Sequence, residues 1–365
     1  MNDWKTVRLG DVCEKGSSNI AQNEITDNNG EYPIYGAAGF IKNVDFYKQE
    51  KPYIGIVKDG AGVGRVSIHP AKSSLIVTMQ YIFPKENIDI KFLAEFLKYQ
   101  NLSRFYTGAT IPHIYFKDYQ NIPLKLPSLQ KQKLISAVLG KCTELIVKNK
   151  TILEKYDTLI KSRFIEMFGT EKDFSKWNCC CVEDVADVTV GVVIKPTQYY
   201  CEKGIPAFRS LNIGEMKVND SDWVYFTEAG NEKNKKSILK ENDVLVVRSG
   251  APGKSCVITK KYEGYNVVDA IIAHPNLEKV NPVFLCMFTN MPHGMNQIKA
   301  KTGGAAQQHF NVGGYNALKM ILPPLSLQND FSAFVQQIDK SKFAVQKSLN
   351  KAETLYKSLM QEYFG

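Results

Sequence analysis

The sequence lacks the long apolar runs of a membrane protein. Among its 365 residues, no run approaches the roughly 18–20 consecutive apolar residues that a membrane helix needs, and the mean hydropathy is −0.24. The first residues, Met-Asn-Asp-Trp-Lys, have neither the basic nor the apolar region of a secretory signal, so we expect none. With 44% hydrophobic and 23% charged residues, the composition is that of an ordinary globular protein.

Cysteine is too sparse and too unevenly placed for a disulfide framework. The chain has 8 cysteines, three of which are adjacent at residues 179–181, and no two have the C-x-x-C spacing. We therefore expect free thiols in the reducing cytoplasm. At the three adjacent cysteines we expect a buried strand rather than a metal site.

Charge gives only a weak indication of a partner. The formal net charge is +9, from 46 basic and 37 acidic residues, and the surplus is spread along the chain without a basic tail. Such a mild excess is consistent with a polyanionic partner but does not establish one. The length favours two or three domains of about 150 residues each.

An internal repeat is the strongest feature of the sequence. Residues 108–169 align without a gap with residues 304–365, and 19 of these 62 positions are identical. Both copies contain the pattern Leu-Pro-x-Leu-x-x-Gln, which ends at Gln132 in the first copy and at Gln328 in the second. Fainter upstream matches, among them a tryptophan near the start of each copy, extend the repeat over nearly the whole chain.

The repeat divides the chain into two bodies, each followed by a tail. We predict bodies at residues 1–127 and 170–323 and helical tails at residues 128–169 and 324–365. Each tail begins just after a proline and ends at a glycine, as helices often do. A helix of about 40 residues is about 60 Å long, and its apolar face would be buried most simply against the other copy. We therefore predict an antiparallel coiled coil with a pseudo-two-fold axis; the alternative is that both are core helices of one domain.

Apolar residues in the tails recur at alternating spacings of three and four, which is typical of a coiled-coil seam. Asn149 also falls on this spacing. The predicted seam consists of Ile135, Val138, Cys142, Leu145, Ile152, Tyr156 and Leu159 in the first tail, and of Phe331, Phe334, Ile338, Val345, Ala352, Leu355 and Leu359 in the second.

The two bodies have the pattern of mixed, strand-rich domains. Runs of β-branched residues alternate with turns rich in glycine and aspartate, and each body has one short helical segment. The predicted strands are residues 53–57, 65–68 and 74–78 in the first body and 243–248 and 256–259 in the second, with helices at residues 91–99 and 282–288. The predicted fold class is therefore α+β, in two tandem copies with two long helices.

A glycine-rich segment follows one predicted strand of each body, at residues 58–65 and 248–254. Neither matches a nucleotide-binding motif. Arg248 stands where a P-loop needs its first glycine, and the first segment has the spacing G-x-G-x-G and precedes a strand rather than a helix. Two interpretations remain: a tight β-turn, or a loop near phosphate or a base that is flanked by Lys58, Arg65, Arg248 and Lys254.

If the polyanionic partner is DNA, the loops that precede the two tails are the best candidates for reading its bases. They comprise residues 107–115 and 301–311, and the second is rich in groups that can form paired hydrogen bonds with adenine or guanine. An ordinary polar loop, or a capping or turn role for the aligned His113 and His309, is the alternative. For a DNA partner, the candidate contacts of the whole chain are Lys58, Arg65, His113, Tyr115, Lys117, Arg209, Arg248, Lys254, Lys301, Gln307, Gln308, His309 and Asn311.

Two divergent bodies, each followed by a similar helix that begins Leu-Pro-x-Leu-x-x-Gln, resemble the specificity (S) subunit of Type I restriction–modification systems. The resemblance covers essentially the whole chain. It implies that each body is a target-recognition domain that reads one half of a split DNA sequence, while the paired helices act as a spacer. It also implies that two modification (methyltransferase) subunits bind the helices, that restriction subunits could join, and that this chain has no catalytic residue.

The resemblance further implies that this chain holds no cofactor or metal, and that S-adenosylmethionine, ATP and Mg²⁺ are bound by partner subunits. Two other functions stay open: a DNA methyltransferase or nuclease with two fused lobes, and a scaffold whose coiled coil spaces two adhesive domains. The sequence has no Asn-Pro-Pro-aromatic signature of an amino-methyltransferase. Methyl transfer by the isolated chain would indicate the enzyme, and salt-dependent binding to duplex DNA would argue against the scaffold.

Overall fold

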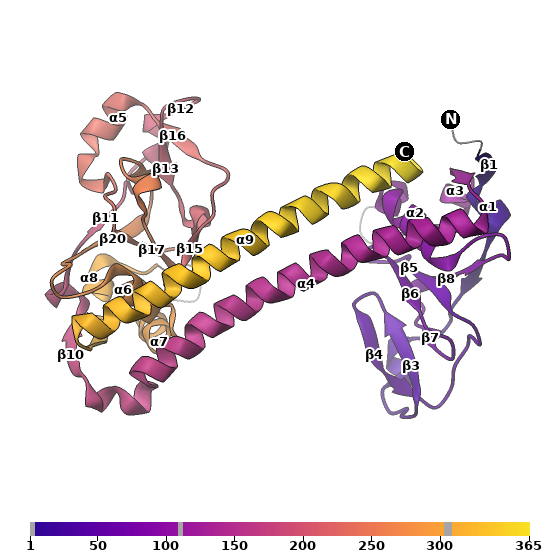
Figure 1. The fold of residues 1–365 in the computed structure, drawn as a ribbon, viewed down its shortest axis with the longest axis horizontal. Coiled ribbons are helices and arrows are strands. Elements are labelled where there is room, and N and C mark those ends of the chain that lie inside the picture. Colours follow the sequence, from indigo (N-terminus) through magenta and orange to yellow (C-terminus); the bar gives the residue numbers. More distant parts are fainter. Residues whose placement is uncertain (1–3, 109–111, 303–308) are drawn as a thin grey trace. The chain divides into compact units, whose positions relative to one another are not determined.

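The chain forms two compact units, each of which takes one half of each long helix (Figure 1). Unit 1 comprises Met1–Thr151 and Val345–Gly365, and unit 2 comprises Ile152–Ala344. The structure, a computed structural model, describes residues 4–108, 112–302 and 309–365. Unit 1 is therefore discontinuous in sequence, because the last turns of the chain complete it.

Unit 1 is built around a four-stranded antiparallel sheet. Its strands are β1 (Lys5–Arg8), β2 (Cys13–Ser17), β3 (Tyr32–Gly36), β4 (Gly39–Val44), β5 (Tyr53–Val57), β6 (Val66–His69), β7 (Ser74–Leu75), β8 (Met79–Pro84) and β9 (Pro123–Leu126), and its short helices are α1 (Leu9–Val12), α2 (Ile90–Tyr99) and α3 (Phe116–Tyr119). The main sheet has the order β2-β8-β5-β6. A second sheet, β4-β3-β7, contains a parallel β3–β7 pair, and β1 pairs with β9.

Strand β5 lies inside the main sheet, and all five of its residues are buried. Alternate residues of a strand point to opposite faces, so Ile54 and Ile56 pack in the core with Phe92 of α2. Tyr53 and Val57 point to the other face and join a separate cluster around β7 and β8. Burial on both faces explains why this strand is a continuous apolar run rather than an alternating one.

Unit 2 repeats the topology of unit 1. Its strands are β10 (Asn178–Cys181), β11 (Ala186–Val190), β12 (Tyr200–Cys201), β13 (Ile205–Phe208), β14 (Ile213–Gly214), β15 (Lys217–Val218), β16 (Val224–Phe226), β17 (Val244–Val247), β18 (Ser255–Val257), β19 (Asn266–Val267), β20 (Ala270–Pro275) and β21 (Lys319–Leu322), and its short helices are α5 (Glu228–Lys233), α6 (Pro282–Asn290), α7 (Pro292–Lys301) and α8 (Val312–Asn316). The main sheet, β11-β20-β17-β18, corresponds to β2-β8-β5-β6. The β13–β19 pair is parallel like β3–β7, and β10 pairs with β21 as β1 does with β9. The predicted tandem α+β repeat is confirmed.

The two long helices are α4 (Leu129–Phe168) and α9 (Leu325–Phe364). Within each unit they run antiparallel. In unit 1, Asn149 donates a hydrogen bond to Ser348 at 3.2 Å. In unit 2, which holds the later part of α4 and the earlier part of α9, Lys342 pairs with Asp157 at 2.6 Å. The predicted antiparallel pairing is confirmed.

Each unit takes core residues from both long helices. The main core of unit 1 includes Ile135 and Leu139 from α4, together with Met360 and Phe364 from α9. The main core of unit 2 includes Ile160, Phe164 and Phe168 from α4 and Phe331, Val335 and Ile338 from α9. A body therefore buries the first half of one helix and the second half of the other.

The predicted seam is only partly right. Ile135, Cys142, Phe331, Ile338 and Ala352 are buried, whereas Val138, Ile152, Tyr156, Phe334, Val345 and Leu359 are half-buried. Leu145 and Leu159 are each 44% exposed and Leu355 is 52% exposed, so the prediction is wrong at these three positions.

Adjacent pairs of apolar residues explain the error. Leu159 is followed by Ile160, which is only 4% exposed, and Leu145 is followed by the half-buried Ile146. Spacings of three-then-four and four-then-three both keep a helix face apolar, because a turn has 3.6 residues. Packing of Ile160 in the core of unit 2 favours the four-then-three order there, so the later residue of that pair faces inward.

Several smaller predictions are tested as well. All eight cysteines are free, and the strand predicted at residues 179–181 is present as β10. It is not buried as expected: Cys179 is exposed, because β10 and β21 form a small two-stranded sheet. The strand predicted at residues 74–78 is limited to β7. Within the described residues, no helix combines the length and apolar character needed to cross a membrane.

Candidate nucleic-acid interface

The glycine turn of unit 1, residues 58–65, connects β5 to β6. Gly60, Gly62 and Gly64 all have positive φ, at 82°, 91° and 85°, which glycine adopts without the steric cost that other residues incur. A Cβ on Gly64 would lie 2.5 Å from the backbone nitrogen of Ser103, so the chain also needs glycine there for close approach. The segment is a tight turn followed by a strand, which agrees with the β-turn interpretation of this sequence.

The segment that leads into α3 packs directly on this turn. The Gly60 N–H donates to the Pro112 carbonyl at 3.0 Å, and the Ile114 N–H donates to the Lys58 carbonyl at 2.9 Å. Between them, His113 Nδ1 lies 2.5 Å from Asp59 Oδ1. The glycine turn and residues 112–117 therefore form one continuous surface, which we call surface 1.

Surface 1 presents cations and an aromatic ring. The ring of Tyr115 is 52% exposed, and the Lys117 ammonium lies 5.4 Å from its centre. Lys58 is partly exposed beside Asp59, at 3.7 Å. Arg65 is exposed, but its guanidinium also donates to the Ala37 carbonyl in the β3–β4 turn at 3.0 Å. A ring and cations together suit contact with bases and phosphates.

The glycine turn of unit 2, residues 248–254, connects β17 to β18 in the same topological position. Gly250 and Gly253 have positive φ, at 83° and 95°. The turn closes through a hydrogen bond of 2.9 Å from the Val247 N–H to the Lys254 carbonyl. A strand begins at Ser255, whereas a P-loop would open a helix here. The prediction that Gly-Lys-Ser is not a nucleotide site agrees with this geometry.

The segment that leads into α8 packs on this second turn. His309 Nδ1 lies 2.9 Å from Ser249 Oγ, and the Phe310 N–H donates to the Arg248 carbonyl at 3.0 Å. Surface 2 is defined as residues 248–254 together with residues 309–311. In each unit, the segment before α3 or α8 thus packs against the glycine turn of the same unit. These two segments align in the internal repeat, and they occupy equivalent positions in the two units.

Arg248 has a more structural position than we expected. Its guanidinium pairs with Asp269 at 2.8 Å and donates to the Phe310 carbonyl at 3.1 Å, and its side chain is only 16% exposed. A cation that is already paired and shielded contributes little to phosphate binding. Lys254, in contrast, is exposed on the same turn.

Other predicted contacts are also engaged within the protein. The Asn311 side chain accepts from the Gly314 N–H at 2.7 Å and caps α8. Lys301 donates to the Ala317 carbonyl at 2.9 Å, and Arg209 donates to the Asp222 carbonyl. Gln307 and Gln308 lie outside the described residues. Whether any of these side chains contacts DNA stays a prediction.

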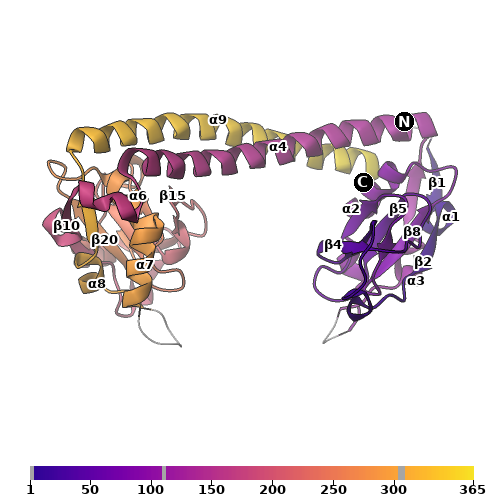
Figure 2. The ribbon, with the colours of Figure 1, turned by 90° about the horizontal axis from the view of Figure 1, so that it is seen from below.

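In each unit, the short helix of the candidate surface lies away from the long helices. Figure 2 shows α3 on the side of unit 1 remote from α4, and α8 on the side of unit 2 remote from α9. Long helices and candidate surfaces thus occupy different faces of each unit, so partners could use both at once.

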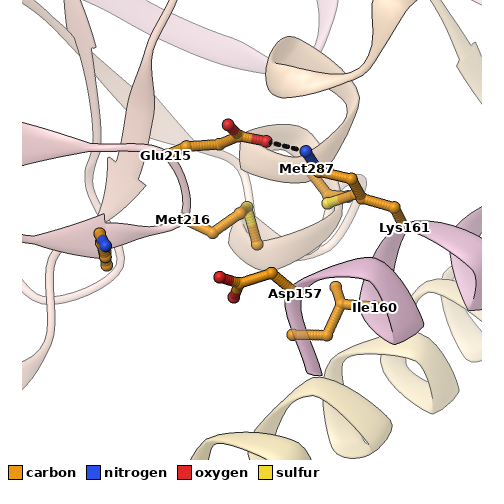
Figure 3. Close-up of a pocket in the computed structure, with 7 residues that line it drawn as sticks. Asp157, Ile160, Lys161, Glu215, Met216 and Met287 are labelled. Carbon is orange, nitrogen blue, oxygen red and sulfur yellow. Dashed lines mark ion pairs between the residues drawn. The ribbon is translucent and has the colours of Figure 1, made fainter. Parts of the chain in front are cut away.

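A hollow of about 150 Å³ in unit 2 lies between α4 and the body (Figure 3). Asp157, Ile160 and Lys161 of α4 line one side. Lys161 forms an ion pair with Glu215 of the β14–β15 turn at 2.6 Å, and Met287 of α6 also lines the hollow. These contacts anchor the helix to the body. Among the residues that the structure describes, no cluster of three or more His, Cys, Asp or Glu side chains could hold a metal ion.

Two α+β units that repeat one topology and share two long antiparallel helices make this a tandem-repeat protein. A family model described as "Type I restriction modification DNA specificity domain" matches residues 1–161 and 174–353. The chain belongs to this family.

Known relatives agree with this membership. The chain is 24% identical over 400 residues to the Type I restriction enzyme MjaVIII specificity subunit of Methanocaldococcus jannaschii, covering 98% of this chain and 91% of that protein. It is 22% identical over 307 residues to the EcoKI specificity subunit of Escherichia coli strain K12, covering 76% of this chain and 64% of that protein.

A solved structure supports the fold. The S subunit of a Type I restriction–modification system from M. genitalium superposes with a TM-score of 0.67 at 14% identity, covering 100% of this chain and 97% of that chain. At this identity the likeness shows the fold alone. The family match and the relatives confirm the prediction of a specificity subunit that is not itself the catalytic component.

Proposed function

We propose that this chain reads a bipartite duplex DNA target and directs modification and restriction subunits to it in the cytoplasm. Surface 1 reads one block of bases and surface 2 reads the other. The repeated surface supports this assignment: in both units a glycine turn and the segment before a short helix are hydrogen-bonded into one face. Because the residues on the two surfaces differ, the two blocks are expected to differ as well.

The long helices are the proposed binding sites for the partner subunits. Two modification subunits would bind along α4 and α9, on the faces away from surfaces 1 and 2, and restriction subunits could then join. S-adenosylmethionine, ATP and Mg²⁺ would be held by those subunits. This chain would supply binding and positioning only.

The paired helices would set the gap between the blocks. Two domains that read neighbouring major grooves on one face of B-DNA have centres about 34–36 Å apart. A 40-residue helix of about 60 Å can maintain such a separation. We expect two short specific blocks separated by several unspecified base pairs. Inserting one heptad into each helix, next to the paired Asn149 and Ser348, should lengthen the gap by about 10 Å of helix without changing either block.

The test compares the isolated chain with the assembled complex. The isolated chain should transfer no methyl group from S-adenosylmethionine and cut no DNA. The complex with modification subunits should methylate adenines at one bipartite sequence, which sequencing of methylated genomic DNA would identify. Methyl transfer by the isolated chain would favour the fused methyltransferase. Absence of salt-dependent duplex binding by the complex would favour the scaffold.

A further inference from the structure

Two aligned histidines make the same contact in the two units. His113 and His309 occupy equivalent positions of the internal repeat. Each forms an isolated β-bridge and a side-chain contact with the residue directly before the first glycine of its turn, which is Asp59 in unit 1 and Ser249 in unit 2. The position of the contact is retained, although the partner changes from a carboxylate to a hydroxyl.

In unit 1 the contact is direct. An ionised carboxylate can only accept hydrogen bonds, so His113 Nδ1 donates to Asp59 at 2.5 Å. The backbone of His113 also forms a reciprocal pair of hydrogen bonds with Thr107, at 2.8 and 2.9 Å. One residue therefore joins three segments: the glycine turn, the chain at Thr107 and the start of α3.

In unit 2 the contact runs through a relay. The Ser249 hydroxyl lies 2.9 Å from His309 and 3.3 Å from Asp269. Since the Asp269 carboxylate can only accept, the hydroxyl donates to it and accepts from His309 Nδ1. The other oxygen of Asp269 binds Arg248, whose guanidinium also holds the Phe310 carbonyl. The relay thus returns to the residue next to His309.

Asp269 has a constrained backbone. Its φ is 47°, in the left-handed region that residues other than glycine rarely adopt. Such conformations persist where the surroundings enforce them, and they concentrate at functional sites. Here the conformation accompanies a carboxylate that binds both Ser249 and Arg248.

We propose that His113 and His309 are equivalent positioning residues, each of which fixes the segment before α3 or α8 against the glycine turn of its own unit and so holds the DNA-reading surface in shape. This proposal rests on the proposed function. The side chains of His113 and Asp59 are 40% and 23% exposed. Partly exposed pairs contribute little to global stability, so loss of the contact should impair recognition much more than folding.

The test uses the full chain assembled with modification subunits. Its probes are a duplex that carries the mapped target and duplexes with one base pair changed in either block. His113→Ala should reduce discrimination at one block by at least about tenfold, as expected when a well-placed base contact is lost, and leave the other block unchanged. His309→Ala should do the reverse.

Conservative variants separate the hydrogen bond from side-chain volume. His113→Asn keeps a donor near the position of Nδ1, so it should retain most of the discrimination that His113→Ala loses. Ser249→Thr keeps the hydroxyl and should retain discrimination at the block read by surface 2, whereas Ser249→Ala should lose it. The control is His274→Asn, because His274 pairs with Asp243 at 2.6 Å at the opposite end of β17 from the glycine turn. This control should leave both blocks unaffected.

The outcomes distinguish this inference from the proposed function. A wild-type complex that binds no duplex overturns the proposed function. If the wild type discriminates at both blocks and folded His113→Ala does too, the positioning role is wrong. Loss of both blocks together in His113→Ala, or a folded His113→Asn that fails as completely as the alanine variant, also overturns it.

Discussion

The side-chain carbonyl of Gln132 accepts a hydrogen bond from the backbone N–H of Asp89 at 2.8 Å, and its amide donates to the Pro127 carbonyl at 2.9 Å. Gln328 forms the same pair of bonds, with Asn281 at 2.9 Å and Pro323 at 2.8 Å. Both glutamines are fully buried. The repeated Leu-Pro-x-Leu-x-x-Gln motif thus fastens each long helix to the N-terminus of the short helix α2 or α6.

Replacing Gln132 with alanine should reduce stability by about 1–3 kcal/mol, because the half-buried Asp89 N–H and the buried Pro127 carbonyl lose the bonds that Gln132 makes with them. Gln130→Ala, two residues earlier on the exposed side of α4, is the matched control and should change stability little. Urea denaturation measures the difference, and hydrogen exchange at the Asp89 amide should accelerate in Gln132→Ala alone. Equal stability of the two variants would contradict this role.

The corrected seam predicts opposite results for two neighbouring residues. Ile160→Ala should cost about 2–4 kcal/mol, since it opens a cavity in the core of unit 2. Leu159→Ala should cost under about 1 kcal/mol, since that side chain is 44% exposed. Thermal denaturation of the two variants compares them directly. A larger loss for Leu159→Ala would favour the seam as first predicted.

Much of the fold could be predicted from the sequence because its signals are local. Pro127 and Gly169 bracket the first long helix, and the observed α4 begins and ends within two residues of them. Strand β5 matches its predicted range, because an apolar β-branched run between turns has few alternatives.

Other features depend on contacts between distant parts of the chain. No local pattern indicates that Met360 and Phe364 complete the core of unit 1, because their apolar character suits either body. Where two apolar residues are adjacent, as at Leu159 and Ile160, the sequence does not indicate which of the two faces inward.

The candidate site was predicted in outline. The repeat identified His113 and His309 correctly as equivalent, and the glycine spacing indicated the turns. The sequence could not distinguish exposed cations from engaged ones, because the partner of Arg248 is 21 residues away at Asp269. Of the alternatives for the two histidines, the turn role holds, because each histidine contacts the glycine turn of its unit; the residue that caps a helix is Asn311.

His69 should make unit 1 less stable in acid. Burial lowers the pKa of its imidazole from 6.5 to about 4, and the ring packs between Tyr35 and Tyr53. Between those two pH values the unfolded chain binds a proton that the folded chain does not, so stability falls as pH drops from 6.5 towards 4, by up to about 3 kcal/mol. Above pH 6.5 this residue should cause no change.

Hydrogen exchange in peptides of β5 and β6 at pH 7 and pH 4.5, corrected for intrinsic rates, measures this loss. His69→Phe keeps an aromatic ring but cannot bind a proton, so it should show a smaller dependence on pH. The same dependence in both proteins would show that other groups cause it.

Lys254 and Arg248 should differ in their effect on DNA affinity, although they share one turn. Lys254→Ala should weaken binding to all duplexes and reduce the slope of log affinity against log salt by about one. Arg248→Ala should leave that slope nearly unchanged, because Asp269 already neutralises its charge. The control Lys176→Ala removes an exposed lysine in the segment between α4 and β10, outside surface 2. Titrations of duplex DNA at several salt concentrations would measure both slopes. Equal changes of slope in the two turn variants would contradict this distinction.

The central claim is that each unit reads its own block of the target. The most direct test replaces residues 1–127 with the first body of another family member, chosen with apolar residues where Met360 and Phe364 pack. The hybrid is assembled with modification subunits, and methylated sites are mapped across the genome. We predict that one block changes while the other block and the gap stay the same. A hybrid that methylates DNA with both blocks changed, or with neither changed, would contradict the claim.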